Sequence, residues 1–490
     1  MKPWKIPVIA FLAVAVAFSA SAQAKGKPRK VTLMTQTFGE NPKPDNFIVR
    51  AIEEATNSDI EFLWVPSTSY KDKLTVTLAA GDLPNIMLIT DPKQSTFIDA
   101  CEHGAFWDIE PYLKEFPVFL AKADPVRLDM TRIYGKLYGI YRHRDIGRSG
   151  YVVRSDWLKN LGIESPRSVD AFYNMLVKFV NNDPDGNGRK DTFGAVTEKG
   201  HSFGPLLAPF GVPNGWWVDA GGSVRNMAES DSMIEGLKFV RRLYSEGLLN
   251  KDYLTAPDSG ALFRKGNAGV RMGGTVDDLG PSNWTQITAN YPNAAYDGIP
   301  RLDGPKGSLS FASGGGFNGV YAFPVSSNRS KEDLRFCLAL MDRINEAPLI
   351  NTLVWGIEGT HYRRDGSAAY RDGKAQVDAY ARDAYSLQQL YLTNANSFTS
   401  NDPSGLRAIE LRTYNEMPGH IVTDPTYTFI SPTWTQKSGE LNQILSDARG
   451  QFIVGAIDEA GYKAAVKKFL SSGGAEAEKE YTALYARSRK

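Results

Sequence analysis

Residues 183–194 carry oxygen-bearing side chains at a spacing that suits a hard metal ion. The segment reads Asp-Pro-Asp-Gly-Asn-Gly-Arg-Lys-Asp-Thr-Phe-Gly, with a carboxylate or amide at every second position before the glycine at position six. Calcium takes six to eight oxygen ligands, and a glycine at position six allows the sharp turn that such a loop needs. The start fits an EF-hand loop, but position twelve is Gly194 instead of the bidentate Glu. The spacing therefore favours a compact structural calcium loop over a paired-helix calcium sensor.

The candidate calcium ligands come from one short stretch. They are the side chains of Asp183, Asp185, Asn187 and Asp191, the backbone carbonyl of Arg189, and Thr192 at the end of the loop. The alternative is a turn without metal, because Asp, Asn and Gly dominate turns in general. Five ligand-type positions in register exceed what a turn requires, so we favour a structural calcium ion.

Residues 1–24 have the form of a secretory signal peptide. Two lysines are followed by an apolar run over residues 6–20 and by the cleavage pattern Ala22-Gln23-Ala24. The run is too short to span a bilayer comfortably. There is no cysteine near the cleavage point, so the sequence does not indicate a lipid anchor. We expect export to the periplasm, cleavage after Ala24 and a soluble mature chain.

Charge and cysteine content argue against a nucleic-acid-binding protein and against a disulfide-rich scaffold. Removal of the two signal-peptide lysines changes the formal net charge from +1 to −1, so the mature chain has no electrostatic footprint for nucleic acid. Cys101 and Cys337 are the only cysteines, and two buried free thiols are a better interpretation than a disulfide framework. The chain is too long for a single core and predicts two or three domains.

Strands and helices alternate from residue 30 onward. Residues 30–36, 59–65 and 86–89 predict strands. Apolar positions predict helices around Ile48 and Ile52 and around Leu74 and Leu78, the second of which ends at Gly81. Later helices are expected at 331–344 and 475–489. This alternation predicts an α/β fold with a parallel sheet.

An ordered set of segments runs through nearly the whole mature chain. They include Leu78-Ala79-Ala80-Gly81-Asp82 and Asp156-Trp157-Leu158, within residues 70–86, 104–113, 136–141, 154–166, 243–248, 355–359 and 452–456. Together they resemble the family 1 extracellular solute-binding proteins that serve ATP-driven (ABC) sugar importers. The Asp-Pro-Asp-Gly-Asn-Gly segment resembles the branch of oligosaccharide binders such as the alginate-binding proteins, which carry a structural calcium loop at the same place. Their loop usually ends in Asp-Glu, where this chain has Asp191-Thr192.

The resemblance implies a two-lobe periplasmic binding protein fold of type II, maltose-binding-like, with hinge crossovers and a ligand cleft. A carbohydrate ligand, permease subunits of an ABC importer and a monomeric state are the implied partners. We expect the first lobe to comprise residues 25–142 and 298–350, and the second lobe to comprise residues 143–297, with the calcium loop at 183–192, and residues 351–490. Crossovers are expected near residues 138–147, near 296–303 and near Trp355.

Aromatic faces that stack on sugar rings are the first candidates for ligand contacts. Trp216 and Trp217 are adjacent in a loop, where both rarely bury, and Trp355 lies near Glu358. Thr275, Asp277 and Trp284 follow a strand in a segment that resembles the one contacting sugar in maltose-type binders. Trp64 and Trp434 are weaker candidates.

Polar groups at strand ends form the second set of candidates for ligand contacts. Gln36 ends the first strand, where an open α/β sheet meets its ligand. Tyr141, Arg142, His143 and Arg144 cluster at the first crossover. Because arginine binds carboxylates bidentately, this cluster suggests an acidic sugar such as a uronate, with an interlobe salt bridge as the alternative.

Enzyme motifs are missing from the sequence. It contains no G-x-S-x-G, no H-E-x-x-H and no Walker A loop. Residues 314–319 match G-x-G-x-x-G, but they precede a strand that ends in proline, so no helix N-terminus is available for a pyrophosphate. A secreted glycoside hydrolase with a cleft carboxylate pair remains the alternative function, and an adhesin or structural exoprotein is a third class. We expect no enzymatic activity.

Overall fold

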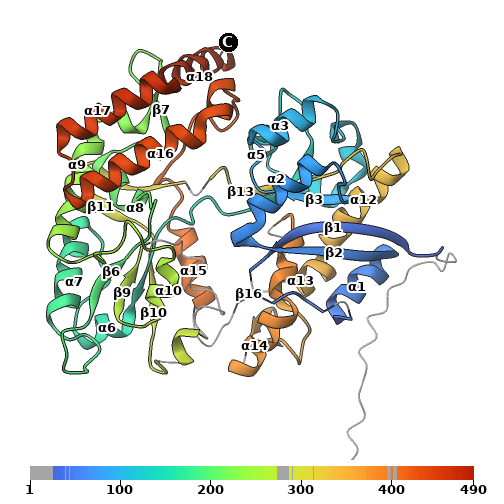
Figure 1. Cartoon of the computed structure of the whole chain (residues 1–490). Coiled ribbons are helices and arrows are strands. Elements are labelled where there is room, and N and C mark those ends of the chain that lie inside the picture. The colour runs from blue at the N-terminus through green and yellow to red at the C-terminus, as the bar shows by residue number, and fades with distance from the viewer. Residues whose placement is uncertain are drawn as a thin grey trace, which may run out of the picture.

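Two α/β lobes make up the protein in the computed structural model, with α16–α18 on one lobe and β1 and β2 on the other (Figure 1). The structure describes residues 26–38, 40–43, 45–272, 286–289, 291–312, 314–371, 373–393, 399–400 and 406–489. The expected signal peptide, and the candidate residues Thr275, Asp277 and Trp284, lie outside these ranges. The two-lobe solute-binding fold that the sequence predicts is confirmed.

The first lobe is built on a five-stranded sheet in the order β2-β1-β3-β13-β4. Its strands are β1 (Arg29–Thr37), β2 (Ser58–Pro66), β3 (Ile86–Ile89), β13 (Phe317–Ala322) and β4 (Gly139–His143). The helices that pack on it include α1 (Phe47–Thr56), α2 (Tyr70–Ala80), α3 (Ser95–Glu102), α12 (Lys331–Ile344) and α13 (Ala347–Trp355). The early strands and helices predicted from periodicity are confirmed, and α2 ends at Gly81 with φ +74°.

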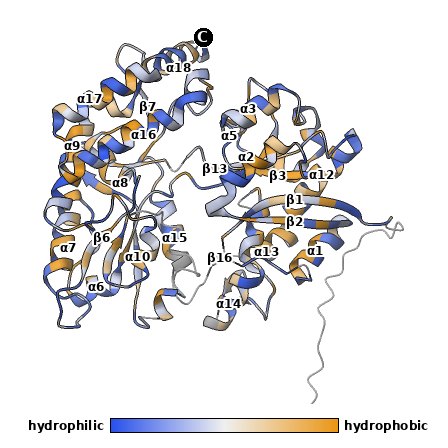
Figure 2. Ribbon diagram, in the orientation of Figure 1, coloured by the Kyte–Doolittle hydropathy of each residue, from blue (hydrophilic) through white to orange (hydrophobic). Residues whose placement is uncertain are grey.

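The second lobe holds a four-stranded sheet in the order β10-β5-β9-β6. Its strands are β10 (Tyr296–Ile299), β5 (Tyr151–Arg154), β9 (Ala268–Arg271) and β6 (Phe193–Val196). The helices of its core include α7 (Val169–Asn181), α9 (Asp231–Ser245), α16 (Pro432–Val454), α17 (Glu459–Phe469) and α18 (Ala475–Ser488). Hydrophilic and hydrophobic residues alternate along the outer helices α17 and α18, as surface helices require (Figure 2).

Both sheets are mixed, whereas the alternating pattern predicted a parallel one. In the first lobe β1 runs parallel to β2 and β3, but β13 is antiparallel to both β3 and β4. The strand β13 enters from the other lobe, so no helical crossover within its own sheet sets its direction. Periodicity identifies strands, but it does not give the direction of a strand that arrives from another lobe.

The chain crosses between the lobes at different points from those expected. The hairpin of β11 (Leu302–Gly304) and β12 (Gly307–Phe311) packs in the second core, so the second crossover follows Phe311. The Gly-Pro-Lys-Gly segment makes this hairpin turn, and turns and hinges share the same residue types. Leu353 and Leu392 belong to the first core, so residues 351–393 lie in the first lobe and the third crossover comes after them. Only the first crossover, between β4 and β5, falls where it was expected.

Two further expectations concern cysteines and membrane association. Cys101 and Cys337 are free and buried, as predicted, and burial raises the pKa of both thiols. Within the described residues, no helix combines the length and the apolar character that crossing a bilayer requires.

Candidate functional site

A cleft of about 750 Å³ lies where the two lobes face each other. Its walls include residues from both lobes, such as Thr90 and Phe317 from the first lobe and Trp216 and Tyr481 from the second. This volume falls within the range of pockets that bury small organic ligands. The cleft is therefore the candidate binding site.

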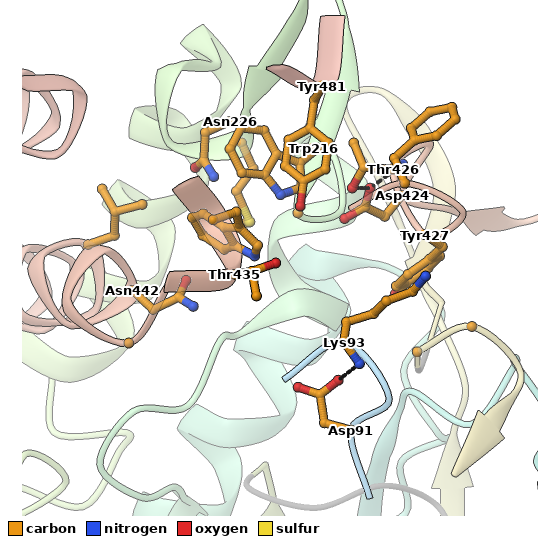
Figure 3. Close-up of a pocket in the computed structure, with 18 of the residues that line it drawn as sticks. Asp91, Lys93, Trp216, Asn226, Asp424, Thr426, Tyr427, Thr435, Asn442 and Tyr481 are labelled. Atoms are coloured by element: carbon orange, nitrogen blue, oxygen red, sulfur yellow. Dashed lines mark hydrogen bonds between the residues drawn. The ribbon is translucent and has the colours of Figure 1, made fainter. Parts of the chain in front are cut away.

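An aromatic cluster forms one wall of the cleft. Trp216 begins β7 (Trp216–Val218) and is almost fully buried, with its ring centroid 5.0 Å from that of Trp434 and 4.9 Å from that of Tyr481. The Trp216–Trp434 pair, with an interplanar angle of 82°, is an edge-to-face arrangement that suits the aromatic quadrupoles, and the Trp216–Tyr481 pair is tilted at 60°. Figure 3 shows Trp216 and Tyr481 side by side above the cleft. Tyr427 and Phe429 also line this part. The cluster offers aromatic surface that is held in place by its own packing.

One face of α16 supplies a polar wall. The cleft-lining residues Thr435, Gly439, Asn442, Ser446 and Arg449 follow one another at alternating spacings of four and three, which places them on the same side of the helix. The opposite side is buried in the second core, through residues such as Leu441, Ala448 and Phe452. At 1.5 Å per residue, the polar face extends about 21 Å along the helix axis. Hydrogen-bonding groups therefore line an extended stretch of the cleft, and several side chains contribute to it.

Asp424 projects into the cleft from the loop between β17 (Ile421–Val422) and α16, beside the aromatic cluster (Figure 3). One of its carboxylate oxygens accepts hydrogen bonds from Thr426 N and Thr426 Oγ1, both at 2.7 Å. Burial raises the pKa of Asp424 to about 6, although these hydrogen bonds lower it. At Gly215 (φ +72°) a Cβ would lie 2.4 Å from the other carboxylate oxygen. The glycine therefore allows Asp424 to pack closely against the start of β7.

The first lobe contributes the segment that follows β3. Thr90, Asp91, Pro92 and Lys93 line the cleft directly after the carboxyl end of this strand. Lys93 Nζ donates a hydrogen bond of 2.6 Å to the carbonyl of Arg132, and burial lowers the pKa of Lys93 to about 8. The glycine-rich segment before β13 also reaches the cleft, through Gly314 and Gly315. The carboxyl end of a strand is thus part of the site, but the strand is β3 and not β1.

Among the predicted ligand residues that the structure describes, Trp216 lines the cleft. Its neighbour Trp217 does not line it, and Gln36 is buried within β1. Trp355 packs against Tyr362 and beneath Arg371, and Glu358 is exposed and forms an ion pair with Arg364 at 2.9 Å. The predictions for these four residues are corrected, because none of them is among the described residues that line the cleft.

The cluster at the first crossover is also corrected. Tyr141 is buried, and its hydroxyl accepts a hydrogen bond from Asp124 N at 2.7 Å. Arg142 is 2% exposed and donates to the Asn318 carbonyl and to Gln389 Oε1, and no described carboxylate forms the salt bridge that the alternative required.

The other two members of the cluster also find partners away from the cleft lining. His143 Nδ1 lies 2.6 Å from Arg127 Nη1. Arg144 donates its backbone N–H to the Gly316 carbonyl and Nη1 to the Tyr391 hydroxyl. All four side chains therefore brace the first lobe and its exit.

The sequence interpretation missed the residues of α16, Asp424 and Lys93. The polar face of α16 has a detectable signal, because small and polar residues recur at helical spacing opposite apolar ones. Asp424 and Lys93 have no such signal, since their position depends on how distant segments meet. Trp434, considered a weaker candidate, is part of the aromatic wall.

The predicted calcium loop lies on the surface of the second lobe, after α7. Asp183 adopts a left-handed backbone (φ +49°) and accepts hydrogen bonds from Asn187 N at 3.1 Å and Gly188 N at 2.8 Å. The Asn187 amide nitrogen donates to Asp185 Oδ2 at 2.9 Å and Asp191 Oδ1 at 3.2 Å. Asp185 Oδ1 is buried and has no hydrogen-bond partner among the residues that the structure describes. These hydrogen bonds hold the side chains of Asp183, Asp185 and Asp191 around the same short loop.

The donor chemistry of this loop fits calcium, with one correction. Backbone hydrogen bonds lower the pKa of Asp183, whereas burial and a hydrogen bond shared with Asp183 raise the pKa of Asp185. The Asn187 amide oxygen accepts a hydrogen bond from Arg189 N at 2.8 Å, so the amide presents its nitrogen to the carboxylates. Thr192 Oγ1 instead donates to the Phe179 carbonyl at 2.7 Å, so it holds the end of α7 and faces away from the loop. In the described residues, no group of three or more His, Cys, Asp or Glu is positioned to hold a metal as it stands.

Comparison with known proteins identifies the family. The family of bacterial extracellular solute-binding proteins matches residues 41–339. The chain belongs to this family. Lipoprotein LipO of Bacillus subtilis is 31% identical and covers 100% of this chain and 99% of its own length. The polygalacturonan/rhamnogalacturonan-binding protein YtcQ of the same organism is also 31% identical, covering 96% of this chain and 94% of its own length.

The solved structures include a solute-binding protein with the same fold. FusA of Streptococcus pneumoniae, an EF-hand mutant in complex with fructo-nystose, superposes with a TM-score of 0.71 at 18% identity, covering 94% of this chain and 99% of FusA. The predicted family and its solute-binding role are therefore confirmed, and this is a family of binding proteins and not of enzymes.

Proposed function

We propose that this solute-binding protein takes a carbohydrate into its cleft and delivers it to the permease of an ABC importer. The observation that carries the proposal is the pairing of an aromatic wall, built around Trp216, with the long polar face of α16. Sugars present apolar C–H faces that stack on aromatic rings and hydroxyls that need hydrogen-bonding groups. The relatives YtcQ and FusA are named for oligo- or polysaccharide ligands, which supports the same class of ligand here.

Closure of the lobes would carry out the binding cycle. Among the described residues, the segment between β4 and β5 connects the lobes, and hinge segments of this kind absorb rigid-body rotation. A sugar that contacts Trp216 in one lobe and Asp91 in the other stabilises the closed form more than the open form. The closed surface then docks on the permease, and the sugar is released without chemical change.

Titration of the purified protein against a panel of neutral and acidic oligosaccharides tests this function. We expect saturable binding in calorimetry and a smaller radius of gyration in X-ray scattering with the same sugar. Chromatography of the incubated sugar should recover it intact. Sugar that is cut would favour the alternative, a glycoside hydrolase, in which Asp91 and Asp424 are the carboxylates available in the cleft. No binding to any glycan would instead favour an adhesin or structural protein.

We also propose that calcium braces the second lobe at Asp183, Asp185, Asn187, Asp191 and the carbonyl of Arg189. The solved FusA protein is an EF-hand mutant, and an EF-hand in that relative supports an ion at such a loop here. An ion that binds only the folded state raises the melting temperature. A chelator should therefore lower the melting temperature, calcium should restore it, and the order of sugar affinities should stay the same. Asp185→Asn should remove the response to chelator, and a wild-type protein indifferent to chelator contradicts the proposal.

Export, cleavage after Ala24 to a periplasmic form and a monomeric state complete the proposal. The relative LipO is named a lipoprotein, whereas the first cysteine in this sequence is Cys101, which is buried. The intact mass of the exported protein distinguishes simple cleavage from lipid attachment. Light scattering after gel filtration measures the oligomeric state.

A further inference from the structure

Arg449 lies in the last two turns of α16 and lines the cleft on the same face as Asn442 and Ser446. It is about 21 Å along the helix from Thr435, which lies beside the aromatic wall. Asp424 lies with the aromatic wall, so the acidic group and the arginine occupy different parts of the cleft. This separation gives the cleft a cationic region of its own.

Arg449 has no counter-ion among the residues that the structure describes. No hydrogen bond or ion pair of its guanidinium is found there, and the groups that interact with it electrostatically are the phenols of Tyr253 and Tyr462 and the imidazole of His201. Burial lowers the pKa of Arg449, and burial together with the charge of Arg449 lowers the pKa of His201 to about 3. His201 is therefore neutral at physiological pH, and Arg449 supplies the charge in this region.

Two other cations, Lys93 in the cleft lining and the buried Arg142 in the first lobe, have hydrogen-bond partners of their own. Lys93 donates to the carbonyl of Arg132, and Arg142 donates to Asn318 and Gln389 outside the cleft lining. Keeping a charged group in a low-dielectric environment without a partner costs free energy, so an unpaired arginine in a cleft is a binding group for an anion. The planar guanidinium matches a carboxylate through two parallel hydrogen bonds.

We propose that Arg449 binds the carboxylate of an acidic oligosaccharide, such as a chain that contains uronate residues. This assignment rests on the proposed carbohydrate-binding function. It narrows the ligand class, with the sugar rings along α16 and the aromatic wall and a carboxylate at Arg449. The sequence pointed to acidic sugars through Arg142 and Arg144, but the side chain available in the cleft is Arg449.

The test compares trigalacturonate, its fully methyl-esterified form, oligomannuronate and neutral oligosaccharides by calorimetry. Wild-type protein should bind an acid form at least tenfold more tightly than its ester or neutral counterpart. Arg449→Gln should remove this preference, so that the acid and its ester bind with affinities within about twofold of each other. Arg449→Lys keeps the charge but loses the fork, and it should give an intermediate preference. It also serves as the second variant if Arg449→Gln does not fold.

Arg242→Gln is the matched control. Arg242 lies on the same lobe but on the outer surface, where it forms an ion pair with Glu246 at 2.9 Å, and its loss removes the same charge without touching the cleft. This variant should keep the wild-type preference for the acid form. Equal binding of acid and ester, or binding of neutral sugars alone, overturns the assignment to a carboxylate while leaving the carbohydrate function intact. If no sugar of either kind binds, the proposed function fails, and the inference fails with it.

Discussion

The free energy of unfolding should decrease as the pH rises and Asp424 loses its proton, which is the opposite of what most aspartates cause. The carboxyl group is enclosed between the Thr426 loop and the start of β7, and burial raises its pKa to about 6. In the unfolded chain the pKa of an aspartate is about 3.9. Because the folded state holds the proton more tightly, this contribution to stability is fully present below about pH 4 and is lost as the pH rises through 6.

The difference of about two pKa units corresponds to about 3 kcal/mol. Water in the cleft screens part of this effect, so we expect about 1–3 kcal/mol in practice. Asp424→Asn keeps an oxygen for the two hydrogen bonds from Thr426 and cannot ionise. Relative to wild type, this variant should be more stable by that amount at pH 8, and the difference should disappear near pH 4.

Urea denaturation of both proteins at pH 4 to 8 measures this difference directly. Asp219→Asn is a control in which the effect should have the opposite sign, since backbone hydrogen bonds in the turn between β7 and β8 (Val224–Asn226) lower the pKa of Asp219. Loss of that carboxylate should destabilise the protein at neutral pH, and the difference from wild type should shrink at acidic pH. Parallel stability curves for wild type and Asp424→Asn would refute the argument that burial controls this group.

Two further substitutions separate structural from ligand-binding roles. Arg142→Ala leaves the Asn318 carbonyl and Gln389 without their donor, so it should lower the free energy of unfolding by about 1–3 kcal/mol. Calorimetry should show the same ratio of acidic to neutral sugar affinity as wild type, and a selective loss of acidic sugars would restore the role predicted from sequence. Trp216→Ala removes a buried ring and should cost about 3–5 kcal/mol in urea denaturation. The substitution should also lower the affinity for neutral and acidic sugars alike. Unchanged affinities would show that the aromatic wall is not part of the binding site.

The sequence predicted elements well and their connections less well. The strands β1, β2 and β3 were identified from local apolar patterns, because each is defined by residues adjacent in sequence. The crossovers were misplaced because glycine and proline mark both tight turns and hinges, and at residues 304–307 they make a hairpin. Local patterns therefore do not show which lobe a segment joins.

The same division between local sequence patterns and tertiary contacts holds for the residues of the site. Trp216 was found because two adjacent tryptophans in a loop are unusual, and the structure places one of them at the cleft. Arg142 was misjudged because its partners lie 176 and 247 positions away in the chain. Arg449 carried a helical spacing that could be read from sequence, but only the structure shows that this face of α16 opens onto the cleft. Residue type suggested the chemistry, and tertiary contacts decided which residues perform it.

The two lobes contribute unequally to the cleft, and this difference sets the order of ligand docking and lobe closure. The second lobe supplies the aromatic wall, Asp424 and the whole face of α16, whereas the first lobe supplies chiefly the segment after β3 and the glycine-rich approach to β13. A ligand gains most of its contacts from the second lobe alone, so it can dock there before the lobes close. Contacts to Asp91 and Lys93 form only when the first lobe arrives, and these later contacts shift the population toward the closed form. Affinity therefore depends mainly on the second lobe, and the closure that a permease would detect depends on the first.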